Sequence, residues 1–130
     1  MAPSHTIGVV GVRDHKGLLY ENTSYIVRTL ENHLRLVGCD LRLLKLVTGG
    51  GKGVEQMVVQ WCEAKDVKCR KIPPNIQQFG AKKAFTVRNN HIVSECDELI
   101  VFWDGCIDII NESVSTAMHQ SKKATVYPVI

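Results

Sequence analysis

The sequence has 130 residues, of which 45% are hydrophobic and 22% charged, a composition typical of one globular domain. No apolar run approaches the roughly 20 residues that a membrane span requires, and the first residues lack the basic and apolar regions of a signal peptide. We therefore expect a single domain over residues 1–130, in the cytoplasm of a cell or host cell, with no membrane partner.

The formal net charge is only +3, but the basic residues gather in the middle of the chain. Between positions 65 and 88 there are seven basic residues and one acid, whereas positions 89–121 hold six acids and no Lys or Arg. A basic middle segment fits an anionic ligand or nucleic acid. A solvated face with a chance excess of lysine explains it equally well.

Apolar runs predict five strands, and patterns with a period of 3.6 residues predict four helices between them. In chain order these are a strand at Thr6–Val12, a helix at Ser24–Val37, a strand at Leu43–Val47, a helix at Val54–Lys65, a strand at Val67–Ile72, a helix at Ala84–Ser94, a strand at Leu99–Trp103, a helix at Ile110–Gln120 and a strand at Thr125–Val129. Pro128 indicates that the last strand is an edge or ends there.

This alternation predicts an α/β fold, a three-layer sandwich of about five mainly parallel strands with helices on both faces. Ligands of such sheets bind beyond the carboxyl ends of the strands. The residues that follow the strands are therefore the candidate site.

A turn with four glycines follows the second predicted strand, and helical periodicity begins directly after it. Without Cβ atoms, the backbone N–H groups can approach an anion closely, and the helix N-terminus adds about half a positive charge. A tight strand-to-helix connection needs glycines only for its dihedral angles, but four glycines with a threonine and a lysine favour phosphate binding. The residues are Thr48, Gly49, Gly50, Gly51, Lys52 and Gly53.

Further polar and small residues are expected at the same edge of the sheet. Gly11 and Arg13 follow the first strand, and Asp104 and Gly105 follow the fourth. Arg88 and Asn89 lie in the third crossover. Cations and N–H groups bind phosphate, while carboxylates and amides bind ribose hydroxyls, so this set fits a nucleotide.

Two common nucleotide motifs are absent. The Walker A pattern fails because Leu46 stands where its first glycine belongs and Gly53 stands where Ser or Thr would hold magnesium. The dinucleotide fingerprint Gly-x-Gly-x-x-Gly is missing as well. A magnesium-dependent NTPase and an ordinary NAD dehydrogenase are therefore unsupported, and no cofactor is expected.

The five cysteines are scattered and odd in number, without Cys-x-x-Cys or a zinc-type spacing to histidine. We expect reduced thiols that mostly pack in the core, and no metal site. Cys106, just after a predicted strand, is a candidate for catalysis, but packing is the simpler explanation.

Four segments in order resemble motifs of the SLOG superfamily, Rossmann-like proteins that include the Lonely Guy enzymes and the DNA-processing A proteins. The likeness runs from Ile7 to Val129 and is closest to a small uncharacterised subgroup. The segments are Ile7–Asp14, with Gly-x-Arg-Asp; Val47–Glu55, the glycine turn with an acid after it; Phe85–Asn89, with Arg-Asn; and Leu99–Gly105, a strand ending in an aromatic residue, an acid and a glycine.

This resemblance implies a Rossmann-like fold and a nucleotide-type ligand in the glycine turn, near Arg13, Arg88 and Asn89. Some members hydrolyse the N-glycosidic bond of nucleoside monophosphates, others bind nucleotide-derived signals, and one branch binds single-stranded DNA. Relatives often pair, which implies a homodimer or a larger assembly.

Three hypotheses for the function of the protein follow from these residues and from the resemblance. The first is binding of a nucleotide or ADP-ribose-like molecule, as a sensor or a sequestering protein. The second is an N-glycoside hydrolase or transferase with Glu55 and Asp104 as catalytic carboxylates. A helix-start charge explains Glu55, and a turn explains Asp104, equally well. The catalytic glutamate of the Lonely Guy pattern falls on Met57. The third is single-stranded DNA binding through the basic middle segment.

Overall fold

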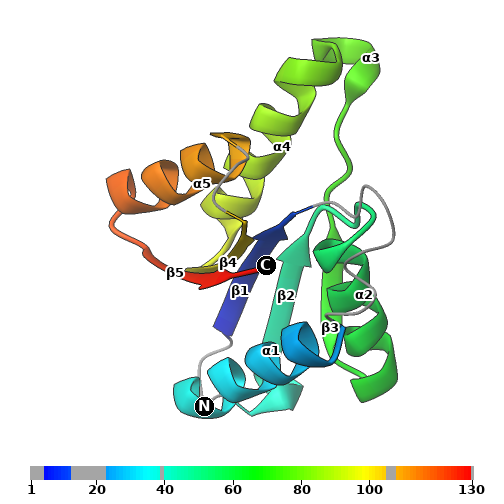
Figure 1. Ribbon diagram of the computed structural model, residues 1–130, viewed down its shortest axis with the longest axis vertical. Helices are drawn as coiled ribbons and strands as arrows, with labels where there is room; N and C mark the ends of the chain where they lie inside the picture. The colour runs from blue at the N-terminus through cyan, green and yellow to red at the C-terminus, as the bar shows by residue number, and fades with distance from the viewer. Residues whose placement is uncertain (1–4, 13–22, 39, 105–107, 130) are drawn as a thin grey trace.

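A computed structural model describes residues 5–12, 23–38, 40–104 and 108–129. The chain alternates strands and helices throughout these ranges (Figure 1). In order the elements are β1 (His5–Gly11), α1 (Thr23–Val37), the 3-10 turn η2 (Leu41–Leu43), β2 (Leu44–Thr48), α2 (Val54–Lys65), β3 (Lys68–Lys71), α3 (Ile76–Phe79), α4 (Ala81–Glu95), β4 (Glu98–Trp103), α5 (Asp108–His119) and β5 (Lys123–Pro128).

The five strands form one parallel sheet in the order β3-β2-β1-β4-β5. Helices α1 and α2 pack together on one face, and α4 and α5 pack together on the other (Figure 1). The predicted three-layer α/β fold is confirmed. After β3 the chain crosses back to β4 beside β1, so the direction of winding changes between β1 and β4. At such a switch the carboxyl ends of the strands leave room for a ligand.

The core lies between the sheet and both helical layers. The central strands β1 and β4 are apolar after their first residues, from Ile7 and from Leu99 onward, because helices cover them on both sides. Ile7, Leu99 and Phe102 are fully buried. Strand β5 is an edge strand that ends at Pro128, as the proline predicted.

The structure contains a short helix, α3, between the predicted strand that ends at Ile72 and the predicted helix that begins at Ala84, where no element was predicted. After Pro73-Pro74, Asn75 caps α3: its Oδ1 accepts a hydrogen bond from Gln78 N at 3.1 Å. Gly80, with φ 79°, ends α3 and begins α4, which therefore starts three residues before the predicted Ala84. Together α3 and the first turns of α4 extend past the ends of β1 and β2 (Figure 1). Within the described ranges no helix is long and apolar enough to cross a membrane.

Candidate functional site

The glycine turn connects the end of β2 to α2 at the carboxyl edge, the edge of the sheet where the parallel strands end. Gly50 and Gly53 have φ values of 73° and 108°, which side chains with a Cβ rarely adopt. The first amide of α2, Val54 N, donates to Val12 O at 3.3 Å. This bond ties the helix N-terminus to the end of β1, so the turn sits against the winding switch.

A buried ion pair supports the turn from inside. Glu55 Oε1 accepts a hydrogen bond from Gly51 N at 3.0 Å and lies 3.4 Å from Arg88 Nη1. The two side chains are only 6% and 8% exposed. Because Glu55 belongs to α2 and Arg88 to α4, the pair joins the two helical layers around the edge of the sheet.

Arg88 is held by further contacts on its own helix. Its Nε donates to Asn89 Oδ1 at 2.9 Å, and its guanidinium carbon lies 5.2 Å from the centre of the Phe85 ring. Gly49 packs directly on this guanidinium: a Cβ there would overlap Arg88 Nη1 and lie 2.6 Å from Arg88 Cζ. Gly49 is therefore required for close packing.

The structure thus brings together several predicted site residues, but in an arrangement that the sequence did not indicate. Glu55, Arg88 and Asn89 form the inner side of the turn instead of standing at its surface. Removing one partner of such a pair leaves an uncompensated buried charge and costs about 3–5 kcal/mol.

The outer side of the turn is open to solvent and carries lysines. Gly50 and Lys52 are exposed. Lys71, at the end of β3, pairs in register with Thr48, and its Cδ would lie 3.2 Å from a Cβ at Gly50. In the sequence Lys71 is only one member of the basic segment, because its place beside the turn depends on the strand register. Exposed Lys83 lies in the first turn of α4.

The basic middle segment is not one patch. Lys68 pairs in register with Lys45 at the amino edge, where the strands begin. Arg70 forms an ion pair with Glu95 at 3.1 Å, and Arg88 is buried. At the carboxyl edge, Lys52, Lys71 and Lys83 are exposed.

The remaining predicted residues differ in their surroundings. Gly11 packs against α2, since a Cβ there would lie 2.6 Å from Val54 Cβ. Thr48 is fully buried, and its Oγ1 has no hydrogen-bond partner among the residues that the structure describes. Asp104 is exposed just after β4. Arg13, Gly105 and Cys106 lie outside the described residues. In the described part of the chain, no three His, Cys, Asp or Glu side chains gather as a metal site.

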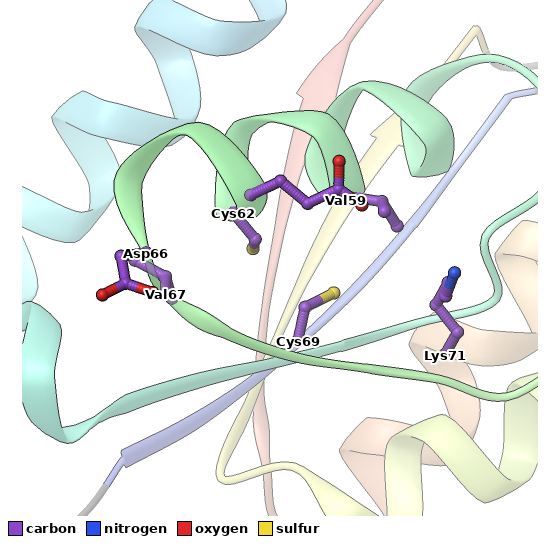
Figure 2. A pocket seen from close by; sticks show the side chains of 7 residues that line it. Val59, Cys62, Asp66, Val67, Cys69 and Lys71 are labelled. Carbon is purple, nitrogen blue, oxygen red and sulfur yellow. The ribbon is translucent and has the colours of Figure 1, made fainter.

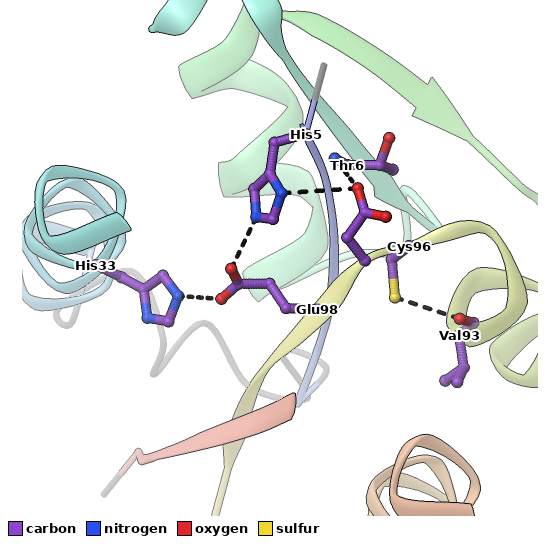
Figure 3. A network of polar contacts seen from close by, with 7 residues as sticks. His5, Thr6, His33, Val93, Cys96 and Glu98 are labelled. Atoms are coloured by element: carbon purple, nitrogen blue, oxygen red, sulfur yellow. Dashed lines mark hydrogen bonds and ion pairs between the residues drawn. The ribbon is translucent and has the colours of Figure 1, made fainter. Parts of the chain in front are cut away.

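A second polar cluster, which the sequence analysis missed, lies at the amino edge (Figure 3). Glu98, the first residue of β4, contacts the rings of His5 and His33 with N···O distances of 2.8 and 2.6 Å. The other nitrogen of His33 lies 2.7 Å from the Tyr127 hydroxyl. These residues are distant in sequence and share no pattern, so only the folded chain reveals them.

Burial alone would raise the pKa of Glu98, but its hydrogen bonds to His33 and His5, with the charges of those rings, hold the pKa below its usual value. Burial, together with the nearby Glu98 charge, raises the pKa of Tyr127. The cluster therefore joins α1 to β1, β4 and β5 around an ionised carboxylate. Its His5 and Glu98 lie at the edge opposite the glycine turn, whereas Tyr127 lies near the carboxyl end of β5.

Two solved structures resemble this arrangement over nearly the whole chain. DNA processing protein A (DprA) from Helicobacter pylori, described in its single-stranded DNA binding mode, matches with a TM-score of 0.65 and 16% identity, over 98% of this chain and 67% of its own. DprA from Streptococcus pneumoniae matches with a TM-score of 0.53 and 14% identity, over 94% of this chain and 58% of its own.

The fold is similar to that of these two DprA structures. This likeness confirms the predicted Rossmann-like α/β architecture. The chain spans about two thirds of one DprA structure and 58% of the other. No protein-family model matches the sequence, and no curated protein matches it.

Proposed function

We propose that the protein binds the phosphate of a nucleotide-type ligand on the outer side of the Thr48–Gly53 turn. The observation that carries this proposal is the construction of the turn. Its inner side is fixed by Glu55 and Arg88, while Gly50 and Lys52 on its outer side are exposed beside Lys71. A fixed turn needs no ordering when an anion arrives, so less conformational entropy is lost on binding.

Each group has a definite part in this proposal. Backbone N–H groups of the turn other than Gly51 N, which donates to Glu55, approach the phosphate oxygens, and the N-terminus of α2 adds its partial positive charge. The ammonium groups of Lys52 and Lys71 neutralise the anion. Thr48 is fully buried at the base of the turn and lies away from this outer side.

The glycosidase hypothesis has weaker support. A catalytic carboxylate must face the sugar carbon, but Glu55 accepts the Gly51 N–H and pairs with Arg88 inside the turn. Its role in this arrangement is to position the turn. Asp104 would have to act without it, and release of free base from nucleoside monophosphates by the wild type but not by Asp104→Asn would support that.

Isothermal titration with AMP, ADP-ribose and inorganic phosphate tests the binding proposal. We expect Lys52→Ala and Lys71→Ala each to weaken binding about tenfold, as loss of a charge-assisted contact does. Lys68→Ala removes the same charge at the amino edge and serves as the matched control, with unchanged affinity. If the control loses as much affinity as Lys71→Ala, general electrostatic attraction explains the binding; no heat with any of the ligands contradicts the proposal.

Single-stranded DNA is the second candidate. It is favoured by the likeness to the H. pylori protein, which binds single-stranded DNA, over 98% of this chain. Exposed Lys52 in the glycine turn, Lys71 in β3 and Lys83 in α4 offer contacts for a run of phosphates.

A competition experiment separates the two candidates. A fluorescent oligothymidine bound to the protein is titrated with ADP-ribose and with unlabelled oligothymidine. If the carboxyl edge binds DNA, unlabelled oligothymidine displaces the probe at concentrations near the dissociation constant of the oligothymidine, and ADP-ribose does not. If the edge binds a single nucleotide, ADP-ribose displaces the probe at the same molar concentrations as oligothymidine.

A further inference from the structure

Two cysteines face each other at the side of the molecule, in a pocket of about 280 Å³ between α2 and β3. Cys62 lies in the last turns of α2, and Cys69 is the second residue of β3. Figure 2 shows both side chains directed into the same space, with Lys71 further along β3. The α2–β3 connection is short, and Val67 N donates to Cys62 O at 2.9 Å, which holds the two elements together.

The two thiols differ in their exposure to solvent and in the direction in which their pKa values are shifted. Cys62 is 1% exposed, whereas Cys69 is partly exposed. Hydrogen bonding to the Cys62 thiol lowers the pKa of Cys69 against the effect of burial, and the Lys71 ammonium adds to the lowering. The same contact, with burial, raises the pKa of Cys62. The more exposed thiol of the pair is therefore the one whose pKa is lowered, and a lowered pKa favours the nucleophilic thiolate.

We propose that Cys62 and Cys69 form a peroxide-sensitive dithiol site, with Cys69 as the attacking thiol and Cys62 as the resolving thiol. The pocket brings the pair together, and Lys71 is the cation beside the reacting sulfur. The pocket shares Lys71 with the proposed phosphate site, but the dithiol proposal does not rest on the proposed ligand.

The chemistry takes two steps, with a hydroperoxide ROOH as oxidant. The Cys69 thiolate attacks the peroxide: an S–O bond forms, the O–O bond breaks, and the alkoxide leaves and takes a proton to become ROH. Cys62 then loses its proton and attacks the Cys69 sulfur: the S–S bond forms, the S–O bond breaks, and water leaves. Two thiols lose two electrons in total, and the peroxide is reduced to ROH and water.

A peptide map of the native protein tests the site. The protein is treated with hydrogen peroxide, its free thiols are blocked with N-ethylmaleimide, and it is then digested with trypsin. Trypsin cuts after Lys65 and Lys68, so only a disulfide keeps the peptide Gly53–Lys65 joined to Cys69-Arg70. We expect this joined species, lighter than the two reduced peptides by two hydrogens. Cys69 should also react with N-ethylmaleimide in the native protein at least about tenfold faster than Cys96, whose thiol is buried.

Three variants make the result specific. Cys69→Ser should abolish the joined peptide, and Cys62→Ser should leave a sulfenic acid on residue 69 that a cyclic 1,3-diketone traps. Cys96→Ser, which removes another buried thiol, should form the disulfide normally. Since the wild-type peptide map needs no variant, poor folding of one variant leaves the test intact. Both cysteines recovered fully alkylated after peroxide, or disulfides formed with other cysteines at equal yield, would overturn the proposal.

Discussion

Gly49 shows how a single missing side chain organises the candidate site. Its φ lies in a region open to any residue, yet a Cβ there would overlap Arg88 Nη1 and lie 2.9 Å from Glu55 Oε1. The close approach of backbone to guanidinium seals the ion pair from water and fixes the turn above it. A phosphate on the outer side of the turn and an ion pair on its inner side both require glycines, and the sequence does not separate these reasons.

We predict that Gly49→Ala destabilises the protein by about 1–3 kcal/mol, because Arg88 must leave its position over Phe85 and Asn89. Chemical denaturation measures the change. Gly51→Ala is the control: its Cβ meets only the end of the Glu55 side chain, at 3.0 Å, and we expect a smaller loss. Equal stability of Gly49→Ala and the wild type would show that the packing is loose.

The lowered pKa of Glu98 predicts how the stability of the folded protein changes with pH. Because its folded pKa lies below the usual value near 4.5, the ionised form stabilises the folded protein above the unfolded pKa. That contribution is lost as the pH falls through the folded pKa. We expect Glu98→Gln to lose about 1–3 kcal/mol at neutral pH. The difference from the wild type should shrink below about pH 4.5. Urea denaturation at a series of pH values measures it, and a difference that grows toward acid would be the wrong sign.

At the scale of elements, the spacing of the hydrophobic residues and the positions of the glycines predicted most of the helices and strands. Strands β1, β2 and β4 were predictable because burial on both faces demands mostly apolar segments. Helix α3 was not, because its four residues are too few to show a period. The position of Lys71 beside Gly50 depends on the register of β3 against β2, and strand register across a crossover leaves no trace in local sequence.

The contact between β1 and α2 is the element-level feature most open to test. Gly11 lets Val54 approach β1, since a Cβ would lie 2.6 Å from Val54 Cβ and 2.7 Å from its Cγ1. We predict that Gly11→Ala pushes the start of α2 outward and costs about 1–3 kcal/mol. Adding Val54→Ala removes the Cγ1 overlap, so the double variant should lose less than the sum of the two single variants. Additive losses, measured by thermal denaturation, would contradict direct contact between these positions.

At the scale of the whole molecule, the fold places basic residues that are neighbours in the sequence at two opposite edges of the sheet. The basic middle segment contributes to both edges of the sheet: Lys68 to the amino edge, Lys71 and Lys83 to the carboxyl edge. The sequence predicted the α/β architecture and the location of the glycine turn. It could not predict that Glu55 and Arg88 satisfy each other, because their contact spans 33 positions and two helical layers.

The separation of the lysines between the two edges of the sheet predicts how the salt concentration affects the binding of oligonucleotides. Each lysine that contacts a phosphate of a single strand contributes about −0.7 to the slope of log K against log salt concentration. We therefore expect Lys71→Ala and Lys83→Ala each to make the slope shallower by about that amount. Lys68→Ala, with the same loss of charge at the opposite edge, should keep the wild-type slope. Fluorescence anisotropy with labelled oligothymidine at several salt concentrations measures all four proteins. Equal slopes for all four would mean that the carboxyl edge makes no phosphate contacts, and the DNA candidate would then fail while the mononucleotide titration stands on its own result.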